Sequence, residues 1–161
     1  MPDRIAACLA IAVIGVAVFR QQPVPVEPDE SGVLVGSPFS DEMTADELQQ
    51  QLGIDFHIPD SAENVVCYIM DGNIGDVRFE LDDCSYIFRF SEQSRDFSGI
   101  NGTPLSSEKI DPSTNAVLDT IADIEYSIYK ISWTDGKLNY ILSSSGETTA
   151  ESIKAIYEEI K

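Results

Sequence analysis

The chain has little of the chemistry on which most enzyme and metal sites depend. It contains one histidine, His57, so a metal site built from several histidines is excluded. A Ser-His-Asp or Cys-His site would have to use His57, which lies between Phe56 and Ile58, and no G-x-S-x-G turn is present to carry a nucleophile. We therefore interpret His57 as a surface or strand-edge residue, and we predict no catalytic residue and no metal ligand.

Cysteine is also scarce. The three cysteines are Cys8, Cys67 and Cys84, and none belongs to a C-x-x-C pair, so zinc and thioredoxin-type chemistry have no support. Cys67 and Cys84 fall in predicted strands, where a cysteine is either a small buried apolar side chain or, in an oxidising compartment, half of a disulfide. The sequence leaves this pairing open, and we predict no cofactor.

Basic residues are heavily outnumbered. Ten Lys and Arg face 28 Asp and Glu, which gives a net charge of −18, and from Gln21 onward 27 acidic residues face eight basic ones. A surface this anionic repels phosphate backbones and anionic lipid headgroups, and no basic stripe offsets it. The composition therefore argues against nucleic acid as a partner and predicts a solvated acidic surface.

The N-terminus carries the one long apolar run of the sequence. Ile5–Phe19 is fifteen apolar or small residues between Arg4 and Arg20, which is shorter than the roughly 20 residues that span a bilayer. The run also fits a signal peptide cleaved after Ala17, or a buried core helix. We favour an uncleaved transmembrane anchor over residues 1–20, followed by a Pro-rich acidic linker over residues 21–38 that adopts an extended conformation.

The strongest strand signal is a β-hairpin over Ser127–Ser143. The dipeptide Asp135-Gly136 predicts a two-residue type I′ turn, because both central residues of that turn need a positive φ. Apolar and aromatic residues alternate in both arms, so that one face of the hairpin is apolar. That face is formed by Tyr129, Ile131, Trp133, Leu138, Tyr140 and Leu142.

Three further strands precede the hairpin. They are predicted at Val65–Met70, Asp76–Leu81 and Cys84–Phe90, and their short connections predict an antiparallel meander. The polar stretch Ser91–Ala116 is interpreted as a long loop. Val117–Glu125 fits the helical and the strand period equally badly, and we expect a strand after Thr120.

Two helices with capping boxes frame the strands. Thr44 with Glu47 opens the first helix, which Gly53 ends, and Thr148 with Glu151 opens the second. The apolar stripe of the second helix requires an apolar sheet face to cover. The predicted fold class is therefore α+β: an antiparallel β-sheet meander with an N-terminal and a C-terminal helix packed on it, over residues 39–161, preceded by a membrane anchor.

The most specific candidate site for a ligand or partner lies where the third strand runs into the polar stretch. Two of the eight basic residues fall within seven positions there, next to a glycine, and an arginine pairs well with a carboxylate. Alternatively, Asp96 and Ser98 fold the loop through side-chain-to-backbone hydrogen bonds. The candidate residues are Arg89, Arg95, Asp96, Ser98 and Asn101.

A second pattern suggests calcium but fits a turn better. Asp71, Asn73 and Asp82 match positions 1, 3 and 12 of a calcium-binding loop, but position 6 is Asp76 instead of glycine. Because Val77 onward already alternates as a strand, we interpret the pattern as a hairpin turn.

Several short motifs follow one another in a recognisable order. They are Ser37-Pro38-Phe39, Gly53-Ile54-Asp55, Ile58-Pro59-Asp60-Ser61, Phe88-Arg89, Asp96-Phe97-Ser98-Gly99 and Trp133-Thr134-Asp135-Gly136. In this order the chain resembles an uncharacterised extracytoplasmic domain family of Gram-positive anaerobes, found in lipoproteins and in single-pass membrane proteins similar to anti-sigma factors. The resemblance runs from about Gly36 to Lys161 and implies an extracytoplasmic location and an α+β fold related to envelope sensor domains, without an activity.

These observations predict a single-pass protein of the cell membrane whose C-terminal domain lies outside the cytoplasm. We expect this domain to sense or bind a small ligand or an envelope protein, without catalysis. The alternative is a cell-envelope hydrolase with paired carboxylates, which requires two acids within about 10 Å of each other in a cleft. A passive lipid or peptide carrier would instead require an open apolar cavity.

Overall fold

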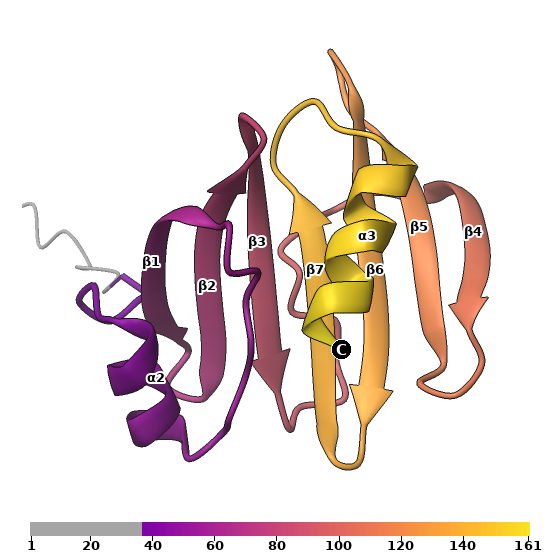
Figure 1. Ribbon diagram of the computed structural model, residues 1–161. Helices are drawn as coiled ribbons and strands as arrows, with labels where there is room; N and C mark the ends of the chain where they lie inside the picture. Colours follow the sequence, from indigo (N-terminus) through magenta and orange to yellow (C-terminus); the bar gives the residue numbers. More distant parts are fainter. Residues whose placement is uncertain (1–36) are drawn as a thin grey trace, which may run out of the picture. The chain divides into compact units, whose positions relative to one another are not determined.

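The computed structural model describes residues 37–161, which form one antiparallel sheet and two helices (Figure 1). The α+β class and the antiparallel sheet are confirmed. The sheet has seven strands in the order β1-β2-β3-β7-β6-β5-β4. The strands are β1 (Glu63–Met70), β2 (Ile74–Leu81), β3 (Cys84–Ser91), β4 (Pro104–Asp111), β5 (Ala116–Ala122), β6 (Ser127–Asp135) and β7 (Leu138–Ser144), and the helices are α2 (Ala45–Leu52) and α3 (Ala150–Ile160).

The predicted anchor at residues 1–20, and the linker as far as residue 36, lie outside the described residues. Within residues 37–161, neither helix has the length and apolar character needed to cross a membrane.

The sheet consists of two meanders that meet at its centre. β1-β2-β3 and β4-β5-β6-β7 each run antiparallel through short turns, and β3 pairs with β7. The chain therefore has to travel from β3, in the middle of the sheet, to β4 at its outer edge. It does so through residues 92–103, which cross the sheet on the face opposite the helices (Figure 1).

The predicted β6–β7 hairpin is confirmed, but its turn is shifted by one residue. Asp135 pairs with Leu138, so the two loop residues are Gly136 and Lys137 instead of Asp135-Gly136. The φ angle is +59° at Gly136 and is not positive at Lys137, which corresponds to a type II′ turn. A type I′ turn occurs instead between β2 and β3, where Asp82 and Asp83 both have a positive φ.

The predicted loop over Ser91–Ala116 is wrong in its second half, because β4 occupies Pro104–Asp111. β4 is an edge strand with six exposed residues, so it lacks the alternation of apolar and polar residues that reveals a half-buried strand. Its hydrogen bonds come from β5, which begins at Ala116 and not after Thr120. The other three predicted strands agree with β1, β2 and β3 to within two residues at each end.

Both helices begin at threonine caps. The Thr44 hydroxyl accepts a hydrogen bond from the Glu47 backbone at 3.3 Å, and the Glu47 carboxylate accepts one from the Thr44 backbone at 2.8 Å, which confirms the capping box of α2. The cap of α3 is Thr149 and not Thr148. The Thr148 hydroxyl instead forms a 2.8 Å hydrogen bond with the phenol of Tyr86.

One continuous core lies between the helices and a single face of the sheet. Leu48 of α2 and the apolar stripe of α3 pack against the same face of the strands (Figure 1). Each fully buried side chain of this size contributes about 1.5–3 kcal/mol relative to exposure. The fully buried members include Val77, Phe79, Phe88, Phe90, Ile131, Leu142, Ile153, Ile156 and Tyr157.

Candidate binding site

A groove of about 580 Å³ lies on the helix face of the sheet. α2 packs on β1 and β2, whereas α3 packs on β6 and β7, so neither helix packs on β3, which lies between β2 and β7. One wall of the groove is the segment around Asp55–His57, which follows α2, and the other is the C-terminal end of α3 with the residues that follow β4. The groove therefore follows from the spacing between the two helices.

The floor of the groove is aromatic. Trp133 and Tyr140 face each other across the β6–β7 pair, with ring centroids 5.2 Å apart and planes 12° apart. Phe88 of β3 lies parallel to Trp133 at 5.9 Å, and Tyr157 of α3 packs edge-on against Trp133 at 5.0 Å. Trp133 is only 4% exposed, and Tyr140 is half-buried. Because the rings hold one another, the floor is a preformed apolar surface.

Asp111 forms a fixed carboxylate at one side of the groove. It accepts hydrogen bonds from the backbone and hydroxyl of Ser113, at 2.9 and 2.6 Å, and from Tyr157 and Lys161, at 3.1 and 2.9 Å. The Ser113 hydroxyl is the strongest of the influences that hold the pKa of Asp111 far below its usual value, followed by the Lys161 ammonium. Asp111 is therefore an ionised acceptor near neutral pH and not a proton donor.

Three further polar residues line the groove and are exposed. They are Asp55, His57 and Asp135, and within residues 37–161 none of their side chains has a hydrogen-bond or ion-pair partner. Burial raises the pKa of the Tyr140 phenol, and the nearby negative charge of Asp135 raises it further. His57 was expected at a surface or strand edge; it is exposed, but its position in a groove wall was not predicted.

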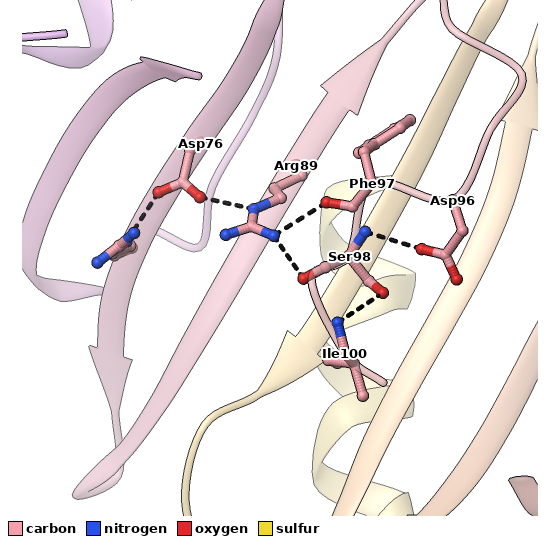
Figure 2. Close-up of polar contacts among 7 residues, drawn as sticks. Asp76, Arg89, Asp96, Phe97, Ser98 and Ile100 are labelled. Carbon is pink, nitrogen blue, oxygen red and sulfur yellow. Dashed lines mark hydrogen bonds and ion pairs between the residues drawn. The ribbon is translucent and has the colours of Figure 1, made fainter. Parts of the chain in front are cut away.

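The predicted site residue Arg89 is buried and already paired. Its Nε donates to the carboxylate of Asp76 at 2.6 Å, and Nη1 donates to the backbone carbonyls of Phe97, at 2.9 Å, and of Ser98 (Figure 2). The residue is 7% exposed, and Asp76 is completely buried. The carboxylate that Arg89 binds is therefore the protein's own, and the arginine holds the crossing loop onto the sheet.

Asp96 and Ser98 also fold this loop. The Asp96 carboxylate accepts the backbone N–H of Ser98 at 2.8 Å, and the Ser98 hydroxyl accepts the backbone N–H of Ile100 at 3.1 Å (Figure 2). The Asp96 carboxylate also accepts the Lys130 ammonium at 3.0 Å. Burial alone would raise the pKa of Asp96, but the hydrogen bonds from Ser98 and Lys130 outweigh it and lower the pKa. The bonds to the backbone of Ser98 and Ile100 are those expected if Asp96 and Ser98 fold the loop and do not bind a ligand.

The remaining predicted residues, Arg95 and Asn101, are exposed. Arg95 bonds to Gln93 at 2.6 Å and lies 3.5 Å from Asp71. Together with Asp96 it lines a smaller hollow of about 270 Å³ on the face opposite the helices. Asn101 does not line that hollow. The structure thus brings Arg89, Asp96 and Ser98 together, leaves Arg95 at the margin, and separates all of them from the aromatic groove.

The calcium-like pattern is a turn followed by a strand. Asp71 and Asn73 lie in the β1–β2 turn, whereas Asp76 lies inside β2. Its carboxylate forms ion pairs with Arg89 and with Arg78, whose Nε lies 2.8 Å from it. Over residues 37–161, no group of three or more His, Cys, Asp or Glu is placed to hold a metal ion.

Cys67 and Cys84 are free thiols on strands that β2 separates. Burial raises the pKa of the Cys67 thiol to about 11, and the negative charge of Asp76 adds to this effect. Cys67 is therefore an unreactive apolar core residue.

Fold and groove together define an α+β domain with a preformed aromatic groove on its helix face. No family model, no curated protein and no solved structure matches the chain. The resemblance to the extracytoplasmic domain family therefore stays a prediction.

Proposed function

We propose that the domain is a binding module without catalytic activity, and that the groove on its helix face holds the ligand or the contact segment of a partner. The observation that carries the proposal is the combination of a preformed aromatic floor with free charged residues at the rim. Binding sites for small ligands are typically concave, largely apolar and about 300–1,000 Å³ in volume, with a few polar groups that fix orientation. The groove has each of these properties.

The proposed module works outside the cytoplasm, tethered to the cell membrane by residues 1–20. The apolar run Ile5–Phe19 and the acidic composition of the remaining chain support this location. Addition of a membrane-impermeant protease to intact cells tests it. The domain should be degraded while a cytoplasmic marker survives, and full protection in intact cells with degradation after lysis would contradict the proposal.

A cell-envelope hydrolase is the second candidate, because three carboxylates, Asp55, Asp111 and Asp135, line the same groove. Glycoside hydrolysis needs one carboxylic acid that is protonated near the working pH. Asp111 does not meet this requirement, since its pKa is lowered. The acid of a hydrolase would therefore have to be Asp55 or Asp135, whereas the ionised Asp111 could serve as its base or nucleophile. Glycan turnover that disappears in the D55N/D135N variant would favour this candidate over the binding module.

The binding role is tested by titrating the domain with four sets of fragments: organic cations, organic anions, neutral sugars and apolar compounds. Trp133 is the sole tryptophan of the chain and lies in the groove floor, so its fluorescence reports on binding, and amide NMR shifts locate the ligand. We expect at least one set to shift the signals of groove residues.

The variant Tyr140→Leu should weaken binding, because it removes an aromatic face from the groove. The matched control is Tyr129→Leu, a half-buried tyrosine of the same core that does not line the groove. The proposal is wrong if no set shifts groove signals, or if all shifts map to the hollow around Arg95.

A further inference from the structure

We infer that the groove recognises an arginine side chain of a basic polypeptide segment. In this arrangement the guanidinium group lies against the aromatic floor at Tyr140 and pairs with the carboxylates of Asp55 and Asp135. The inference rests on the proposed binding role and specifies the chemistry of the partner.

The charge balance of the domain favours a cationic partner. Four of the 28 acidic and two of the ten basic residues precede Ser37, which leaves 24 acidic and eight basic residues in the described part of the chain. Six of these eight form ion pairs within the domain. The surface therefore presents an excess of unpaired carboxylates, which attracts cations over long range and speeds their association.

The same imbalance holds inside the groove. Its one lysine, Lys161, is bound to Asp111 at 2.9 Å and to Glu158 at 2.9 Å, so it neutralises carboxylates of its own surroundings. Asp55 and Asp135 keep their charges without a partner among residues 37–161. A ligand that enters the groove therefore meets negative charge above an aromatic floor, which suits an organic cation and opposes an anion.

The domain itself shows how it holds a guanidinium group. The guanidinium carbon of Arg78 lies 5.0 Å from the ring centroid of Phe39 and 5.2 Å from that of Tyr68, and its Nε donates to Asp76 at 2.8 Å. Two aromatic rings and one carboxylate thus hold a side chain that remains 42% exposed. The groove is lined by the same kinds of group, with no occupant from the described chain: the rings of Tyr140 and Phe56, and the carboxylates of Asp55 and Asp135.

Arginine fits this set better than lysine does. Its planar guanidinium stacks on an aromatic face while its N–H groups bond to carboxylates in the same plane, whereas an ammonium is a strongly hydrated point charge. The volume of about 580 Å³ and the open shape leave room for the apolar stem and for flanking main chain. The Ser113 hydroxyl at the rim donates to Asp111 and keeps its lone pairs for a main-chain N–H of the partner.

The test compares two peptides, acetyl-Gly-Arg-Gly-amide and the same peptide with citrulline, which has nearly the shape of arginine but no charge. Trp133 fluorescence and amide NMR shifts at low ionic strength report binding to the domain. We expect the citrulline peptide to bind at least about tenfold more weakly, because it keeps the stacking surface and loses the charge.

A pair of double variants separates the groove from the general acidity of the surface. D55N/D135N should weaken the arginine peptide by about tenfold and leave the citrulline peptide unchanged. The matched control, E92Q/E125Q, removes two exposed charges outside the groove and should change binding by less than about threefold.

Three results would overturn the inference. They are equal affinity for both peptides, unchanged binding by D55N/D135N, or binding of n-propylguanidinium, which carries the same single charge without a main chain, as tightly as the arginine peptide. A neutral or anionic fragment that binds in the groove where the arginine peptide does not would also overturn it, while the proposed binding role stands. Absence of groove binding by every class would overturn both.

Discussion

The two faces of the sheet are closed by different means. On the helix face, α2 and α3 bury apolar side chains and leave the groove between them. On the opposite face, residues 92–103 cross the strands, and a loop carries backbone polar groups that need partners when buried. Arg89 satisfies two of these backbone groups by donating to loop carbonyls, and Lys130 holds the loop through the side chain of Asp96.

This difference determines which charges are available for binding. On the face that residues 92–103 cross, which we call the loop face, Arg89 already binds Asp76 and the loop. This arginine of the predicted site therefore has a structural role. On the helix face, burial of apolar area closes the core, and Asp55 and Asp135 at its margin are left without an ion-pair partner among residues 37–161.

The largest expected loss of stability comes from breaking the buried ion pair on the loop face. Asp76→Asn leaves the guanidinium of Arg89 buried without a counter-charge, and breaking a buried pair in this way costs about 3–5 kcal/mol of unfolding free energy. Urea unfolding measures the loss. The control Asp71→Asn removes the exposed pair with Arg95, at 3.5 Å, and should cost less than about 1 kcal/mol. Equal effects of the two variants would show that Asp76 and Arg89 do not hold this face.

An intermediate loss of stability is expected where the helix face of the sheet is closely packed. A Cβ at Gly75 would collide with the ring of Phe90, its cross-strand neighbour, so Gly75→Ala should destabilise the domain by about 1–3 kcal/mol. Gly146→Ala is the control, since a Cβ there meets nothing within 4 Å and its φ is not positive. Thermal and urea unfolding compare the two, and a neutral Gly75→Ala variant would mean that Phe90 moves freely on this face.

The smallest expected change in stability concerns Asp111, the fixed carboxylate of the groove. Because the folded-state pKa of Asp111 lies below its value of about 3.9 in an unfolded chain, its contribution to stability is present above about pH 4 and is lost as the pH falls through the folded-state pKa. Asp111→Asn should therefore be less stable than the wild type at pH 6, and the gap should narrow as the pH falls below 4.

Thermal unfolding from pH 3 to pH 7 measures this gap. Asp135→Asn, which removes an acid with no ion-pair partner in the described domain, serves as the control and should stay within about 0.5 kcal/mol of the wild type at pH 6. A gap for Asp111→Asn that is independent of pH would contradict the assignment.

Much of the fold could be predicted because its signals are local. A capping box is complete within four residues, as Thr44 and Glu47 show, and the alternation of apolar residues in β2, β3, β6 and β7 places a row of them on the helix face of the sheet. Errors of one residue at Thr149 and at Gly136 arose where two neighbouring residues both suit a cap or a turn. The strand β4 was missed because an exposed edge strand has no such alternation.

The candidate site was harder to predict, because its residues come together only in the folded chain. Asp55, Asp111, Asp135 and Tyr140 are distributed over 86 residues of sequence, and nothing local in the chain connects them. The aromatic hairpin was nevertheless a usable signal, since Trp133 and Tyr140 were correctly predicted on one face. The sequence by itself therefore determined the acidic charge, the two helices, the strands with alternating apolar residues and the composition of the aromatic face, all of which depend on local sequence. Only the tertiary structure decided three other features: the pairing of β3 with β7, the binding of Arg89 by Asp76 and the crossing loop, and the gap between the two helices. Each of them results from contacts between segments that are far apart in the chain.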